Sequence, residues 1–168
     1  IGFCLVGSEM CIRDRNGSGT SQWQVRESCP LSSFTNDGLI TSSRPMAFQA
    51  RGGFATTVRN NGTMNINRNL TLIARNAGSQ LIFENNGAID VNRDFRLNAR
   101  NGADPLDLQF DMRFTGSSLT VARDLEFINS GGMILNDAAN VSTITMDRNG
   151  TQGIIGDSKV SYHHLILD

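Results

Sequence analysis

Residues 61–72 read NGTMNINRNLTL, residues 86–97 read NGAIDVNRDFRL, and residues 116–127 read GSSLTVARDLEF. The three segments share one pattern: a turn, apolar-x-apolar, x-Arg followed by Asn or Asp, and apolar-x-apolar again. The second segment follows the first by 25 residues, and the third follows the second by 30. A period in this range indicates a repeat architecture, in which each repeat is one supersecondary unit.

Apolar and polar residues alternate within each segment, as in Met64 and Ile66 or Leu70 and Leu72. A period of two places the apolar members on one face of a β-strand. A helix would need apolar residues at three- and four-residue spacing, which these pairs do not sustain. The same alternation predicts further short strands at residues 80–83, 106–111, 133–135, 144–146, 154–155 and 160–162.

Each repeat therefore carries about three short strands and cannot bury its apolar side alone, so neighbouring repeats must stack to complete a shared core. The sequence predicts an all-β parallel β-helix, or solenoid, of about four to five coils, whose strands pair about 4.8 Å apart. An antiparallel β-sandwich is the alternative, because it is also built from short strands separated by turns. The in-register repeat favours the solenoid.

The N-terminal residues 1–15 share no pattern with the repeats. Back-translation of residues 4–15 resembles the transposon-end adapter used to prepare sequencing libraries. A signal peptide is the alternative, but the apolar run at residues 1–6 is too short for an h-region and lacks a basic n-region. We therefore interpret residues 1–15 as an artefact, residues 16–44 as an N-terminal cap or linker, and residues 45–168 as solenoid repeats of a fragment open at both ends.

Composition gives no support for two classes of function, nucleic-acid binding and membrane spanning. Asn and Gly each occur 17 times, which is typical of a chain with many tight turns. The net charge of −1 provides no electrostatic footprint for nucleic acid, and no apolar run is long enough to span a bilayer. Once residues 1–15 are set aside, Cys29 is a lone cysteine. It is either a free thiol or paired outside this chain.

Two acidic residues are candidate ligand-binding residues. Asp107 and Asp111, with Gln109 between them, are predicted to share the outer face of one strand. Carboxylates in this arrangement suit a Ca²⁺ site or the acid–base pair of a polysaccharide-cleaving β-helix, and a solvated polar face is the alternative. His163 and His164 are adjacent on a predicted strand and point to opposite faces, so they are poorly placed to chelate a metal. We assign no catalytic residue, cofactor or metal ligand.

The Arg-(Asn/Asp) pair recurs in every repeat. Arg68, Arg93 and Arg123 are predicted to stack on one outer edge, where like charges destabilise one another. The Asn or Asp after each Arg would interleave acceptors and reduce this repulsion. The functional alternative is a ladder, with Arg93 and Arg123 as candidates, that holds a sulfated or carboxylated glycan through bidentate contacts.

The repeat resembles the β-solenoid stretches of large bacterial surface proteins, including filamentous-haemagglutinin-like and autotransporter-like adhesins. The closing residues 160–168, VSYHHLILD, are similar to a phrase in surface proteins that use the type nine secretion route. The resemblance covers about residues 57–168. It implies a secreted or cell-surface scaffold with a structural or adhesive role, no catalysis in this fragment, and glycans or host or cell-surface components as partners. The alternative is a polysaccharide-binding or polysaccharide-cleaving β-helix enzyme fragment that uses Asp107 and Asp111.

Overall fold

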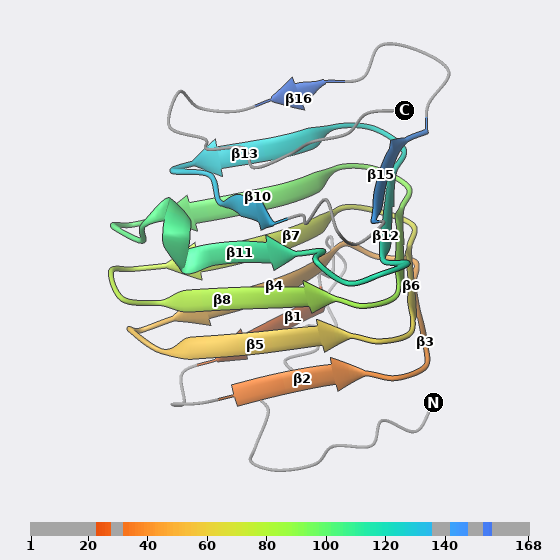
Figure 1. The fold of residues 1–168 in the computed structure, drawn as a ribbon. Coiled ribbons are helices and arrows are strands. Elements are labelled where there is room, and N and C mark those ends of the chain that lie inside the picture. The colour runs from red at the N-terminus through yellow and green to blue at the C-terminus, as the bar shows by residue number, and fades with distance from the viewer. Residues whose placement is uncertain (1–22, 28–31, 136–141, 148–152, 156–168) are drawn as a thin grey trace.

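The computed structural model describes residues 23–27, 32–135, 142–147 and 153–155. The chain winds through three parallel sheets, which we call sheets A, B and C, and visits them in the same order in every coil (Figure 1). Sheet A contains β1 (Trp23–Glu27), β4 (Met46–Arg51), β7 (Leu70–Arg75), β10 (Phe95–Arg100), β13 (Leu125–Asn129) and β16 (Ile154–Ile155). Sheet B contains β2 (Ser32–Asn36), β5 (Ala55–Asn60), β8 (Gln80–Asn85), β11 (Leu108–Asp111) and β14 (Met133–Leu135). Sheet C contains β3 (Leu39–Ser42), β6 (Thr63–Ile66), β9 (Ala88–Val91), β12 (Ser118–Val121) and β15 (Thr143–Met146).

The predicted parallel solenoid is confirmed. The continuous stretch from residue 32 to residue 135 makes about four turns. All strand pairs among the described residues are parallel, which rules out the antiparallel sandwich. The apolar-x-apolar pairs of each repeat form consecutive strands of sheets C and A, and the Arg-(Asn/Asp) pair lies at the corner between them.

The core consists of ladders of matching side chains that run from coil to coil. In sheet C, Met64, Ile89 and Leu119 lie in register, and all three are buried. The centre of the solenoid also contains a stack of phenylalanines, with 5.4 Å between the ring centroids of Phe48 and Phe83. Each coil therefore completes the burial of the next one, as the repeat predicts.

An asparagine ladder lies at the corner between sheets B and C. Asn36, Asn60 and Asn85 end successive strands in register, and each is at most 7 % exposed. Asn36 Nδ2 donates to Asn60 Oδ1 at 2.7 Å, and Asn60 Nδ2 donates to Asn85 Oδ1 at 2.8 Å. In the next coil, Asn85 Nδ2 donates to the carbonyl oxygen of Ser118 at 3.0 Å. Amide side chains can extend such a chain because each one is both donor and acceptor.

Glycines stack at the same corner, two residues beyond the asparagines. The amides of Thr63 and Ala88 donate to the carbonyl oxygens of Gly38 and Gly62 at 2.8 and 3.0 Å. A Cβ atom placed on Gly62 or Gly87 would lie 2.0 Å from the glycine carbonyl oxygen of the preceding coil. The close approach of two backbones, rather than an unusual φ, therefore requires glycine here.

The first coil lies within the region predicted to be a cap or linker. Strands β1, β2 and β3 pair with β4, β5 and β6, so this region contributes one strand to each sheet. The first coil belongs to the solenoid, but a terminal coil can also cover the end of the coil next to it. Its role as a cap therefore stays a prediction. The adapter-like residues 4–15, Cys29, the strand predicted at 160–162 and the histidines at 163 and 164 lie outside the described residues.

Candidate functional site

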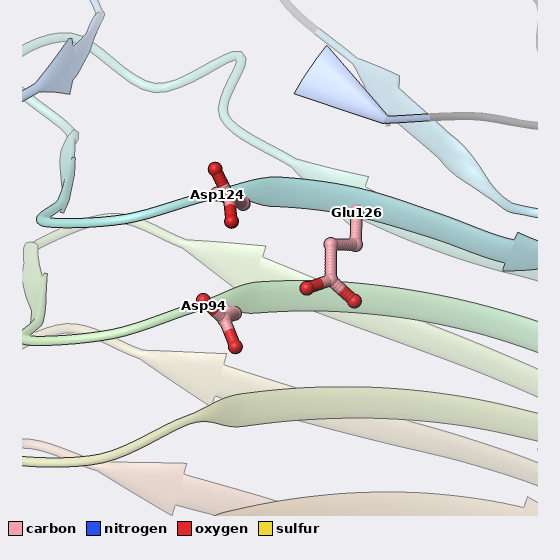
Figure 2. Close-up of side chains that lie close together, drawn as sticks. All are labelled: Asp94, Asp124 and Glu126. Atoms are coloured by element: carbon pink, nitrogen blue, oxygen red, sulfur yellow. The ribbon is translucent and has the colours of Figure 1, made fainter. Parts of the chain in front are cut away.

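Three carboxylates gather where sheet C turns into sheet A. Asp94 and Asp124 immediately precede β10 and β13, and Glu126 occupies an outward position of β13. Figure 2 shows Asp94 and Asp124 on adjacent coils, with the Glu126 carboxylate directed toward the coil that carries Asp94. One oxygen from each residue lies within 4.8 Å of the others. Asp94 is only 2 % exposed.

Arg96, on β10, neutralises much of this cluster. Its Nη2 donates to Asp94 Oδ2 at 2.8 Å, and its Nε donates to Glu126 Oε2 at 2.8 Å. Its Nη2 also donates to Glu126 Oε1 at 3.2 Å. The hydrogen bonds with Glu126 raise the pKa of Arg96 above its ordinary value, against the opposing effect of burial. Because the folded-state pKa is raised, the resulting stabilisation is fully present below the ordinary pKa of arginine and therefore throughout the neutral range.

The carboxylate oxygens of the cluster can be compared with the ligands that a divalent cation needs. Ca²⁺, for example, takes six to eight oxygen ligands. Both oxygens of Glu126 and one of Asp94 already accept hydrogen bonds from Arg96. Asp124 Oδ1 accepts a hydrogen bond from the Gly153 amide at 3.0 Å. A cation would have to displace the arginine from its partners. The cluster is therefore an ion network in which Arg96 supplies the positive charge.

The predicted Arg68–Arg93–Arg123 edge occupies the same corner. The Arg123 amide donates to the Arg93 carbonyl oxygen at 3.2 Å, so these two residues are neighbours on adjacent coils. Arg123 Nε lies 3.4 Å from Asp94 Oδ1, which is the contact that the predicted interleaving of acceptors requires. Arg68 and Arg93 are exposed. Glycan binding by Arg93 and Arg123 stays a prediction.

The structure separates Asp107 from Asp111. Residues 105–107 form a short 3₁₀ helix, η1 (Pro105–Asp107), so the strand predicted over 106–111 is wrong in its first half. Asp104 caps this turn, and Asp107 Oδ2 accepts a hydrogen bond from the Asp104 amide at 3.1 Å. The physical reason is the proline at the first helical position together with the capping box, which favour a helical turn over a strand.

Asp111 is engaged in a separate contact at the end of β11. It is 6 % exposed, and its carboxylate accepts hydrogen bonds from Arg113 Nε at 3.0 Å and Nη2 at 2.8 Å. The prediction that Asp107 and Asp111 share one strand face is therefore wrong. Their proposed role in ligand binding, and the Ca²⁺ prediction that depends on it, stay predictions.

The pairing of Arg96 with Glu126 was missed in the sequence. The signal was present, because the two residues occupy the same position of repeats that are 30 residues apart. Opposite charges on adjacent strands in register are favourable cross-strand pairs. Comparing the charges of Arg96 and Glu126 at this outward position, and not only the identity of the residues, predicts the pair.

We expect Arg96→Met to lower the free energy of unfolding by about 2 kcal/mol, because the buried Asp94 loses its 2.8 Å hydrogen bond and keeps only the longer ion pair with Arg123. Arg59→Met is the matched control. Its 2.6 Å bond to Glu84 is exposed, and such pairs contribute about 1 kcal/mol or less. Urea denaturation at neutral pH measures both losses, and equal losses in the two variants would contradict a buried network.

A scan against protein-family models and searches of curated proteins and of solved structures find no match to this chain. In the part of the chain that the structure describes, no helix has the length and apolar character needed to cross a membrane. The fold and the contacts of the described residues therefore carry the functional argument.

Proposed function

We propose that this chain is a rigid structural or adhesive scaffold from an exported bacterial surface protein. The observation that carries the proposal is the continuity of the ladders through successive coils. Leu70, Phe95 and Leu125 lie in register in sheet A and are fully buried, and sheets B and C contain equivalent ladders. A solenoid of this kind grows in length by adding coils, at about 4.8 Å per coil. That property suits a stalk that holds other parts of a protein at a distance.

The contacts of the candidate carboxylates support this role over catalysis. A general acid or base must come within hydrogen-bond reach of its substrate. Asp107 closes the η1 turn, and Asp111 is buried with both oxygens bonded to Arg113. In the acidic cluster, the Glu126 carboxylate is bound to Arg96. These side chains stabilise turns and corners of the solenoid.

Export and surface exposure rest on the resemblance of the repeat to bacterial surface proteins. Glycans or host or cell-surface components are the partners that an adhesive scaffold of this kind would contact. The outward faces of the sheets offer polar and charged positions in regular rows at which such partners can bind.

The proposal is tested on intact cells of the bacterium that encodes this chain. Antibodies raised against the purified chain are expected to label unpermeabilised cells, with an antibody against a cytoplasmic protein as the negative control. Labelling that appears only after permeabilisation would contradict the proposal.

A second assay addresses catalysis directly. The purified chain is incubated with a panel of neutral and acidic polysaccharides, and the released reducing ends and unsaturated products are measured. We expect no release above the buffer control. Release that is lost in Asp107→Asn or Asp111→Asn would replace the scaffold proposal with a polysaccharide-cleaving enzyme.

A further inference from the structure

A second arginine repeat ends three successive strands of sheet A, β4, β7 and β10. Residues 50–52 read Ala-Arg-Gly, and residues 74–76 and 99–101 both read Ala-Arg-Asn. The three alanines are fully buried, so the following arginines lie on the outer face of the sheet. The Gly or Asn after each arginine has a positive φ, between 57° and 76°, which turns the chain out of the sheet at the same place in each coil. The repeated sequence therefore produces a repeated corner.

The three arginines lie in register. Arg75 of β7 pairs with Arg51 of β4 on one side and with Arg100 of β10 on the other. Adjacent strands are about 4.8 Å apart, so three positive charges form a row along the solenoid axis. We call Arg51, Arg75 and Arg100 the arginine ladder. Like charges directly opposite one another destabilise a sheet, so the ladder has a cost that needs an explanation.

The described part of the chain does not neutralise the ladder. No carboxylate whose side chain the structure describes forms an ion pair with any of its three guanidinium groups. Other arginines of the chain, such as Arg96 and Arg113, do have such partners. Within the described residues, arginines elsewhere have counter-charges but this row has none.

Two buried hydrogen-bond donors, one within the ladder and one next to it, also lack acceptors. Arg100 Nε belongs to the ladder itself, and Gln49 Nε2 lies two residues before Arg51 on the same outer face. Gln49 is 4 % exposed. A buried donor without an acceptor is costly, and a ligand that supplies oxygen acceptors would remove that cost.

The backbone beneath the ladder is fixed before any ligand arrives. The buried Ser79 hydroxyl donates to the Arg75 carbonyl oxygen at 2.6 Å and accepts a hydrogen bond from the Gly53 amide at 3.0 Å. The Asn76 amide donates to the Arg100 carbonyl oxygen at 3.1 Å. These bonds tie successive corners together, and a binding row on a rigid scaffold loses little entropy when a ligand binds.

We propose that the arginine ladder binds a linear carboxylated polysaccharide, which runs along the solenoid axis and presents carboxylates to the guanidinium groups. The planar guanidinium fork matches a carboxylate with two parallel hydrogen bonds. A nucleic acid is disfavoured because the chain has a net charge of −1. This inference rests on the proposed function, since an exported scaffold is the form that meets such polysaccharides.

Binding is measured by fluorescence anisotropy with labelled polygalacturonate oligomers. We expect Arg75→Met to weaken binding by about tenfold or more, because it removes charge-assisted hydrogen bonds from the centre of the ladder. Arg75→Lys retains the charge without the fork and is expected to bind with intermediate affinity. Arg59→Met removes one positive charge from sheet B, away from the ladder, and is the control, with unchanged binding expected.

The thermal midpoint of each variant separates binding from folding. Arg75→Met removes like-charge repulsion, so its Tm should not fall below that of the wild type. Wild-type affinity in Arg75→Met, or an equal loss in Arg59→Met, would overturn the assignment to this ladder. Tighter binding of dextran sulfate or single-stranded DNA than of polygalacturonate would overturn the choice of ligand. Surface labelling without polyuronate binding contradicts only this inference, whereas binding without surface labelling contradicts only the proposed function.

Discussion

Gly87→Ala is expected to destabilise the solenoid by about 3 kcal/mol or more, because the new methyl group overpacks a contact between two backbones. Its Cβ would lie 2.0 Å from the Gly62 carbonyl oxygen, and real Cβ atoms do not approach so closely. That oxygen accepts the Ala88 amide at 3.0 Å and therefore cannot move without weakening the pairing of two coils. For a chain of this length, the loss corresponds to a Tm lowered by about 6–12 °C.

Gly38→Ala is the matched control for this prediction. Gly38 occupies the same corner one coil before Gly62, but a Cβ atom there has no neighbour within 4 Å. Its φ is not in the left-handed region, so alanine fits and reduces the entropy of the unfolded chain. We expect an unchanged or slightly raised Tm for Gly38→Ala and a large loss for Gly62→Ala. Similar Tm values for Gly38→Ala and Gly87→Ala would contradict the close approach.

Much of the fold could be predicted because the inward positions repeat. Ile66, Val91 and Val121 occupy equivalent places in the sequence and form one ladder in sheet C. The period of two along a strand specifies which side chains face the core. The period of 25 or 30 along the chain specifies how the strands of neighbouring coils align. The exception was residues 105–107, where local capping chemistry overrode the alternation of Leu106 with Leu108.

The candidate sites were harder to predict because outward residues need not repeat in kind. At one outward position of sheet A, Thr71 is followed by Arg96 and Glu126, so a search for identical residues finds nothing there. The arginine ladder does repeat, in the segments Ala-Arg-Gly and Ala-Arg-Asn, but it lies at the end of the pattern that was aligned. Whether an arginine has a counter-charge depends on three-dimensional contacts, and no sequence period contains that information.

The asparagine ladder provides the second large effect, because Asn60→Ala breaks it at its middle member. Asn60 is fully buried, and its amide donates to Asn85 Oδ1 and accepts from Asn36 Nδ2. Truncation removes the donor to the buried Asn85 Oδ1, and a buried unsatisfied group costs about 1–3 kcal/mol. Asn36 Nδ2 keeps the carbonyl oxygens of Gly38 and Thr63 as acceptors at 3.2 and 3.3 Å. Together with the small cavity, we expect a loss of about 2–4 kcal/mol in the free energy of unfolding. Urea denaturation followed by circular dichroism measures it.

Two further variants separate hydrogen bonding from packing at this corner. Asn60→Asp keeps the volume but cannot donate to Asn85 Oδ1, so it should destabilise at least as much as Asn60→Ala at neutral pH. Asn92→Ala removes an exposed asparagine pair, with 3.0 Å between Asn92 Nδ2 and Asn67 Oδ1, and should change stability by about 0.5 kcal/mol or less. A tolerated Asn60→Asp would show that only the shape of the side chain matters. A loss in both Asn60 variants, with Asn92→Ala neutral, would identify the buried amide chain as the link that holds successive coils in register.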